Sequence, residues 1–184
     1  MLNPRDTFCS RCGAAFPPPL QYPRTCPRCG AQVWANPIPV AVVLQPVASE
    51  GRLGLLVVRR AIPPQVGRLA LPGGFVEEHE AWAVGAAREL REEAGVSIEP
   101  ASLAPSWFTS TEPRPDRVLL FAAGVPLDRG ALGPWAPGAE TSARGLVFGP
   151  GGLDDVFAFP LHAEAARRWF SAQRLTGPHA FTEA

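Results

Sequence analysis

Apolar residues along the chain follow two periodicities, and these predict its elements. The continuous apolar run Ile38–Leu44 is typical of a buried strand, and Leu53–Arg59 predicts a second strand. From His79 to Ala94, good helix formers follow one another without a proline, which predicts a long helix. The apolar face of this helix carries Ala83, Ala87, Leu90 and Ala94.

Shorter segments complete the pattern. They predict strands at Leu69–Leu71, Trp107–Thr111, Arg117–Val125 and Arg144–Phe148, and a closing helix at Leu161–Arg174. The segments Ala61–Arg68 and Leu127–Gly138 are rich in proline or glycine and predict loops. Strands around one long helix, with a second helix at the end, favour an α/β fold in which a sheet lies between helices.

Length and composition indicate one domain of ordinary size with a small appendage. The chain has 184 residues, of which 46% are hydrophobic, enough for a sizeable core. We expect a small N-terminal domain at residues 1–35, a main domain at 36–176 and a frayed tail at 177–184. The formal net charge is zero and no basic stripe is present, which argues against a dedicated nucleic-acid binder.

The hydropathy pattern also bears on location. No apolar run approaches the length of a membrane-spanning helix, so we expect no membrane partner. The first twenty residues lack the apolar centre of a secretory signal. These features predict a cytoplasmic protein.

Three glutamates gather on one side of the long helix. At about 100° per residue, Glu89, Glu92 and Glu93 fall within one narrow arc, away from the apolar face. Like charges one turn apart are unfavourable, and Arg88 offsets only part of the repulsion. A hard divalent cation such as Mg²⁺ would balance these carboxylates and bridge them to substrate phosphates. The alternative is an ordinary solvated acidic face.

Glycines flank this helix on both sides. Pro72-Gly73-Gly74 follows a short apolar segment, and paired glycines permit unusual backbone angles and close approach of a ligand. The same pair could serve as a tight turn, which is compatible with ligand binding. Gly95 is suited to the left-handed conformation that commonly closes a helix.

Four cysteines form a matched pair of motifs near the start of the chain. Cys9-x2-Cys12 and Cys26-x2-Cys29 are separated by thirteen residues, and each pair reads Cys-x-Arg-Cys-Gly. Four thiolates in this arrangement predict a closed, structural Zn²⁺ site. Two disulfides are the alternative, but a reducing cytoplasm would keep the thiols free.

Residues 74–96 carry a longer motif that spans the acidic helix. The stretch reads G-x5-E-x7-R-E-U-x-E-E-x-G-U with U aliphatic, from Gly74 through Glu80 and Arg88 to Val96. It resembles the motif that defines the Nudix hydrolases, and the resemblance covers roughly residues 38–175. The family likeness implies an α/β/α sandwich with a mixed sheet, and catalysis with Mg²⁺ or Mn²⁺.

The resemblance also assigns roles to residues. It implies that Arg88 holds Glu89 in place and that Glu80 braces the loop before the helix. The general base is Glu89 or Glu93. A later glutamate often completes the site, for which Glu140 is our candidate, with Glu112 as a competitor. The residues implied to hold the catalytic metal are Gly73 (through its carbonyl), Glu89, Glu92, Glu93 and Glu140.

The N-terminal cysteines narrow the resemblance to Nudix enzymes with a zinc ribbon. This group includes NADH pyrophosphatases and FAD- or ADP-ribose-cleaving relatives, in which the ribbon is structural and often lies near a dimer interface, so a homodimer is possible. The stretch Ser110–Arg117 departs from the motif of the NADH enzymes by lacking its aromatic pair.

We therefore expect a Mg²⁺-dependent pyrophosphohydrolase that cleaves a nucleoside diphosphate linked to another group. The products would be a nucleoside monophosphate and a phosphorylated partner. Alternatives are a nucleoside triphosphate pyrophosphatase and a non-catalytic nucleotide sensor. Substrate contacts stay open among Trp107, Phe108, Trp135, Arg114 and Arg117.

Overall fold

The computed structural model describes residues 7–184, and the chain divides into two compact units, Met1–Pro37 and Ile38–Ala184. The division falls just after the boundary expected at residue 35. The first six residues of the expected N-terminal domain lie outside the described residues. None of the helices among residues 7–184 combines the length and apolar character needed to cross a lipid bilayer.

The N-terminal unit is a pair of turns joined by a short ribbon. Strands β1 (Arg24–Thr25) and β2 (Gln32–Val33) pair antiparallel. Cys9, Phe16 and Cys26 form a small core, and Val33 of β2 packs against it. Because so little apolar surface is buried, this unit depends on something other than its core for stability.

The larger unit contains all remaining elements. Its strands are β3 (Ile38–Leu44), β4 (Pro46–Ser49), β5 (Arg52–Arg60), β6 (Leu69–Ala70), β7 (Gly73–Phe75), β8 (Ala104–Ser110), β9 (Arg117–Ala123), β10 (Leu127–Asp128), β11 (Thr141–Phe148) and β12 (Ala180–Glu183). Its helices are α1 (Trp82–Ala94), α2 (Leu153–Val156) and α3 (Pro160–Ala172), with 3₁₀ turns η1 (Pro100–Ser102) and η2 (Arg129–Leu132).

These strands form two mixed sheets. One has the order β7-β3-β9-β8, in which β3 and β9 run parallel and the other neighbours antiparallel. The other has the order β10-β4-β5-β11-β12, with β6 beside β5. The expected mixed-sheet α/β architecture is confirmed.

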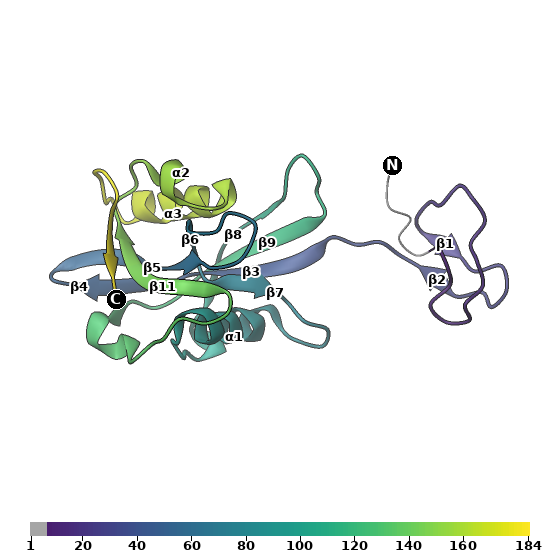
Figure 1. Cartoon of the computed structure of the whole chain (residues 1–184), viewed down its shortest axis with the longest axis horizontal. Coiled ribbons are helices and arrows are strands. Elements are labelled where there is room, and N and C mark those ends of the chain that lie inside the picture. The colour runs from purple at the N-terminus through teal and green to yellow at the C-terminus, as the bar shows by residue number, and fades with distance from the viewer. Residues whose placement is uncertain (1–6) are drawn as a thin grey trace. The chain divides into compact units, whose positions relative to one another are not determined.

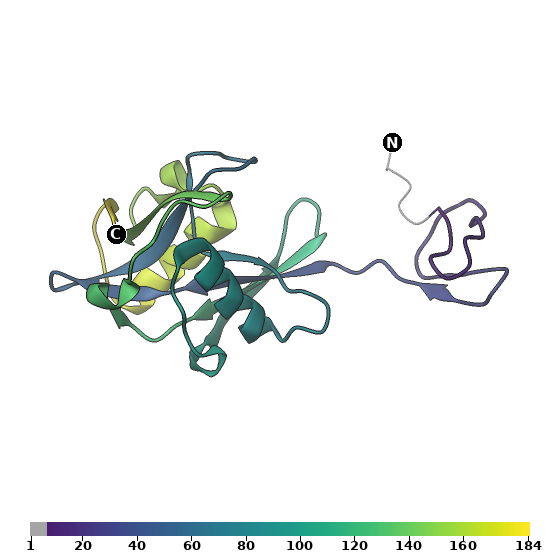
Figure 2. The ribbon, with the colours of Figure 1, turned by 60° about the horizontal axis from the view of Figure 1, so that its bottom comes forward.

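Helices cover both faces of the strands, so the unit has three layers (Figure 1). Successive residues of β3 alternate between two cores: Ala41 and Val43 pack on the side of α1, whereas Val42 and Leu44 pack on the side of α3. This alternation follows from the period of two in a strand. Figure 2 shows α1 lying across the face of the strands.

The long helix begins later than its composition suggests. It starts at Trp82, not at His79, because His79 has a φ of 67°, which a right-handed helix excludes. The segment before the helix is instead a turn in which the Glu80 amide donates to the Glu77 carbonyl over 3.2 Å. The helix ends as expected, with Gly95 in the left-handed conformation.

The expectation of a frayed tail at residues 177–184 is wrong. Strand β12 lies within it and pairs antiparallel with β11, from Gly145 opposite Glu183 to Phe148 opposite Ala180. Its four-residue sequence is too short and polar to read as a strand, so its order comes from the sheet edge it joins. Strand β4 was also not anticipated, although the Glu50-Gly51 turn, with both φ values positive, is a hairpin signal.

Candidate active site

The last turn of α1 places one carboxylate against the diglycine turn. The Gly73 amide donates to Glu93 Oε2 over 3.0 Å. Burial, and also the nearby Glu89 and Glu140 carboxylates, raises the pKa of Glu93 from 4.5 to about 7, although the Gly73 amide opposes the shift. Glu93 is therefore a carboxyl that gains and loses its proton near neutral pH.

Arg88 joins the turn before α1 to the helix itself. Its Nε and Nη2 donate to the two oxygens of Glu80, each over 3.0 Å, and Nη2 also donates to the Phe75 carbonyl. Its Nη1 donates to Glu89 over 2.8 Å and to Glu92 over 3.2 Å. The hydrogen bonds from Arg88 hold the pKa of Glu80 below its ordinary value. Paired hydrogen bonds from one guanidinium to both oxygens of a carboxylate fix its position and also stabilise its charge.

Glu80 reaches this position because Gly85 leaves room for it. A Cβ on Gly85 would lie 2.7 Å from Glu80 Oε2, closer than side-chain packing allows. The Glu80 side chain is only 12% exposed and also accepts the Glu77 amide over 3.1 Å. Gly85 was not singled out from the sequence; a glycine inside a run of good helix formers is the signal that points to it.

Gly74 likewise leaves room for the Glu89 carboxylate. A Cβ at Gly74 would collide with the Glu89 carboxylate, so this position accepts no larger residue without moving that group. Burial raises the pKa of Glu89, the Arg88 guanidinium opposes this, and the Glu92 and Glu140 charges add to it. Glu92 itself is half exposed, on the outer side of Arg88.

The two candidates for a later glutamate differ in position. Glu140 precedes β11 and is close enough for its charge to raise the pKa of both Glu89 and Glu93. Glu112 lies in the exposed loop between β8 and β9. Arg60 was not anticipated from the sequence: it acts on Glu93 in the opposite direction, lowering its pKa.

The carboxylates around Gly73 fit a hard divalent cation by their chemistry. Oxygen donors of this type suit Mg²⁺, and a cation would relieve the repulsion among Glu89, Glu93 and Glu140. The carboxylate oxygens of these glutamates do not converge on one point in this structure, since the Glu89 and Glu92 carboxylates accept hydrogen bonds from Arg88. Among residues 7–184, the four cysteines are the one group whose possible ligand atoms all lie within 4.8 Å of one another.

The N-terminal unit brings those four sulfurs into a compact cluster. Cys9 Sγ lies 3.7 Å from Cys29 Sγ, and Cys12 Sγ lies 3.6 Å from Cys26 Sγ. The cysteines are free thiols, and a tetrahedral Zn²⁺ with Zn–S bonds of about 2.3 Å requires sulfurs about 3.8 Å apart. The cluster fits the expected structural zinc site and not a pair of disulfides.

The aromatic and arginine candidates for substrate contact divide between core and surface. Trp107 stacks on the buried Phe121 with ring centroids 5.1 Å apart, and Trp135 donates its indole N–H to the Glu93 carbonyl. Phe108 is 74% exposed on β8. Arg114 lies in the exposed loop before β9, and Arg117 is the exposed first residue of that strand.

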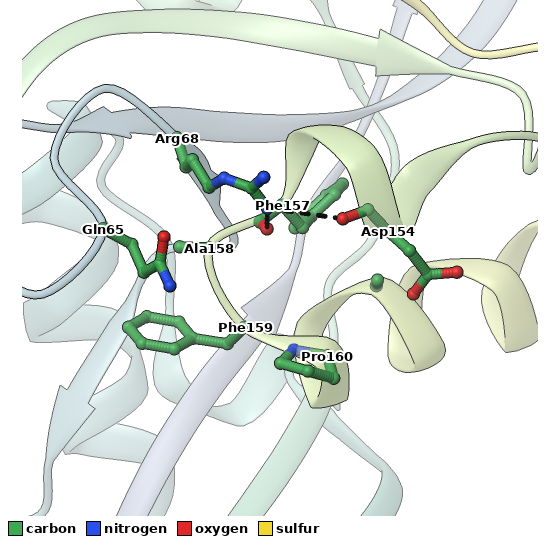
Figure 3. A pocket seen from close by; sticks show the side chains of 8 residues that line it. Gln65, Arg68, Asp154, Phe157, Ala158, Phe159 and Pro160 are labelled. Carbon is green, nitrogen blue, oxygen red and sulfur yellow. Dashed lines mark hydrogen bonds between the residues drawn. The ribbon is translucent and has the colours of Figure 1, made fainter.

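A separate pocket of about 170 Å³ lies beside the start of α3 (Figure 3). Gln65, Arg68 and Phe159 are among its lining residues, and Arg68 Nη1 donates to the Phe157 carbonyl over 3.0 Å. None of the glutamates of the motif at residues 74–96 lines it, so this pocket is distinct from the carboxylate cluster.

Solved structures share this fold. A NUDIX hydrolase from Nitrosomonas europaea is 26% identical, with a TM-score of 0.63, over 94% of this chain and 96% of that one. An Ap4A hydrolase from C. elegans is 15% identical (TM-score 0.57; 74% and 98% covered). The NUDIX domain of Shewanella oneidensis NrtR, crystallised with ADP ribose, is 18% identical (TM-score 0.54; 75% and 87% covered). The last two similarities concern the fold alone.

The family match and the similarity to a solved NUDIX hydrolase place the chain among hydrolases of phosphoric anhydrides. The family model of the NUDIX domain matches residues 37–182, and the chain belongs to that family. The expectation of a Nudix enzyme is therefore confirmed.

Proposed function

We propose that this chain is a Mg²⁺- or Mn²⁺-dependent pyrophosphohydrolase that acts on a nucleoside diphosphate linked to another group, of the ADP-ribose, FAD or NAD(H) type. Water attacks one phosphorus of the diphosphate, and the bridging P–O bond breaks. The products are a nucleoside monophosphate and a phosphorylated partner.

One observation carries this proposal: the Glu93 carboxylate lies against the diglycine turn, accepting the Gly73 amide over 3.0 Å, with the Glu89 and Glu140 charges nearby. A carboxylate held within reach of an attacking water is suited to accept its proton. We assign this role to Glu93, with Glu89 as the alternative.

The other residues of the site would bind the metal ions or position the side chains that bind them. Divalent metal ions, when bound, supply neutralisation of the diphosphate charge and activation of water. The groups that would hold them are the Gly73 carbonyl and the carboxylates of Glu89, Glu92, Glu93 and Glu140. Arg88 fixes Glu89, and Glu80 fixes Arg88, through the hydrogen bonds described above.

The relatives support the substrate class without determining it. The NrtR domain was crystallised with ADP ribose, a nucleoside diphosphate joined to a sugar. The Ap4A hydrolase is named for a substrate in which phosphates join two nucleosides. Both ligands contain a phosphoric anhydride, which is the group that a divalent cation held by the carboxylates would bind.

The same proposal covers the rest of the chain. Residues 1–35 form a zinc ribbon with a structural role, residues 36–176 form the hydrolase domain, and two chains form a homodimer. A zinc site of four thiolates requires that the cysteines stay reduced, and with this site we also place the protein in the cytoplasm.

The test is a panel of substrates with Mg²⁺ and product identification by mass. ADP-ribose, FAD, NADH and nucleoside triphosphates are each incubated with the wild type, Glu93→Gln and Glu99→Gln. We expect Glu93→Gln to lose at least about 10²-fold in turnover, the low end for a positioned base. Glu99→Gln, which removes an exposed carboxylate outside the motif, is the matched control.

Three results would contradict the proposal. Full activity of Glu93→Gln would remove the assigned base. Release of inorganic pyrophosphate from triphosphates alone would favour a triphosphate pyrophosphatase. Tight binding of ADP-ribose without cleavage, in Mg²⁺ or Mn²⁺, would favour a nucleotide sensor.

A further inference from the structure

The carboxyl end of α1 is held by side chains that are distant in sequence. The last carbonyls of a helix have no partner within it. Here the Glu93 carbonyl accepts two hydrogen bonds, from Trp135 Nε1 over 3.0 Å and from Thr141 Oγ1 over 3.2 Å. The Ala94 carbonyl accepts Arg144 Nη1 over 2.9 Å. One segment, residues 135–144, therefore binds the turn that carries Glu93.

The fit of Trp135 depends on the glycine that closes the helix. A Cβ on Gly95 would lie 3.0 Å from Trp135 Cδ1 and 3.8 Å from Arg144 Nη1. Gly95 thus has two requirements, a φ of 67° and room for the indole ring. The ring lies against the helix end and keeps its N–H directed at the Glu93 carbonyl.

Arg144 is a buried cation whose hydrogen bonds all go to backbone carbonyls. Its residue is 4% exposed, and it donates to the carbonyls of Leu132, Gly133, Ala94 and Ala184. The partial negative charge at a helix carboxyl end favours a cation there. A buried guanidinium costs free energy that a well-packed apolar side chain would avoid, and these four hydrogen bonds offset part of that cost.

The same segment carries Glu140, directly before Thr141. The Gly138 amide donates to the Thr141 carbonyl over 2.9 Å, which closes a tight turn around Glu140. The Ala61 amide donates to the Glu140 carbonyl over 2.7 Å, which fixes the turn to the end of β5. Thr141 is 3% exposed, so its hydroxyl has little freedom to leave α1.

We infer that Trp135, Thr141 and Arg144 are positioning residues, which fix the last turn of α1 against the Glu140 turn and so set the spacing of the Glu93 and Glu140 carboxylates. This inference rests on the proposed function, because it requires those carboxylates to act as one cation site. Trp135 is then no base-stacking residue, and the Pro- and Gly-rich segment before β11 is a support for the site.

Mn²⁺ binding by the zinc-loaded full chain tests the inference, with free Mn²⁺ measured by electron paramagnetic resonance. Thr141→Val removes the hydroxyl at nearly constant volume, and Trp135→Phe removes the N–H but keeps a ring on Gly95. We expect each to raise the Mn²⁺ dissociation constant by about tenfold, the usual effect of losing a group that orients metal ligands. Thr141→Ser, which keeps the donor, restores binding close to that of the wild type.

Two controls separate positioning from general stability. Ser142→Ala removes a neighbouring hydroxyl that donates to the Arg59 carbonyl, away from α1. Val147→Ala weakens the core on the α3 side of the same strand. Both should bind Mn²⁺ as the wild type does; equal weakening in Val147→Ala would overturn the inference.

The failure of the inference and the failure of the proposed function give different results. Wild-type binding by both Thr141→Val and Trp135→Phe, with binding lost in Glu93→Gln, would overturn the positioning role alone. Wild-type binding by Glu93→Gln would instead remove the carboxylate cluster as the cation site, and the proposed function with it. If Thr141→Val does not fold, Trp135→Phe and Thr141→Ser still decide the question.

Discussion

Replacing Glu93 by glutamine should stabilise the protein in the absence of Mg²⁺ and Mn²⁺ while it lowers turnover by at least about 10²-fold. The amide can still accept the Gly73 N–H, and it carries no charge to bury. The carboxyl has a pKa of about 7 when folded, against 4.5 for the ordinary group. A difference of roughly 2.5 between the two pKa values, at about 1.4 kcal/mol for each, corresponds to at most about 3.5 kcal/mol.

The pH window follows from the sign of this shift. Between pH 4.5 and 7 the folded wild type keeps a proton that the unfolded chain has lost. The free energy of unfolding of the wild type therefore falls as pH rises through this window, and above it the penalty is constant. Glu93→Gln lacks this penalty, so the two proteins should be equally stable near pH 4.5 and differ most at pH 8.

Urea unfolding at pH 4.5 and at pH 8, in buffer freed of divalent ions around zinc-loaded protein, measures the difference. Adding Mg²⁺ at pH 8 should reverse the order, because only the wild type then binds the ion well and gains stability by mass action. Glu99→Gln serves as the exposed control. Equal stability of the wild type and Glu93→Gln at pH 8 without Mg²⁺ would refute the reasoning.

Two further predictions concern the diglycine turn and the zinc site. Gly74→Ala should lower turnover by about 10²-fold, because the added Cβ displaces the Glu89 carboxylate by a distance that catalysis does not tolerate. Slower steady-state turnover with an unchanged free energy of unfolding would support this prediction. Turnover equal to that of the wild type would contradict it. Removal of zinc should unfold residues 7–37 and leave the larger unit intact, because a structural zinc contributes about 10–16 kcal/mol to such a small unit. Hydrogen exchange measures this, and protected amides around Cys9 and Cys26 in zinc-free protein would refute it.

Much of the larger unit could be predicted because its signals are local. The apolar run Ile38–Leu44 coincides with β3, and the predicted helix at Leu161–Arg174 overlaps α3. The glutamates of the motif at residues 74–96 could be located because their spacing is a property of the sequence alone. Their separation from the apolar face of α1 follows from helix geometry.

Other features depend on contacts between distant residues and left no local signal. Strand β12 is ordered by pairing with β11, and the Arg144 guanidinium is hydrogen-bonded to main-chain oxygens from three separate segments. Trp135 was considered for base recognition, since an isolated tryptophan in a loop carries no indication of its partner. Its donation to the Glu93 carbonyl became visible only with the helix and loop placed together.

Strand β3 places a limit on how this protein can change. Neighbouring residues on it serve opposite cores, and Ala41 and Val42 also pair with Gly74 and Gly73. Loss of a single residue within it would exchange the two sets of buried side chains and move the diglycine turn along the sheet. Strand β3 can therefore accept substitutions but no insertion or deletion. Insertions in the evolution of this protein should be confined to the loops.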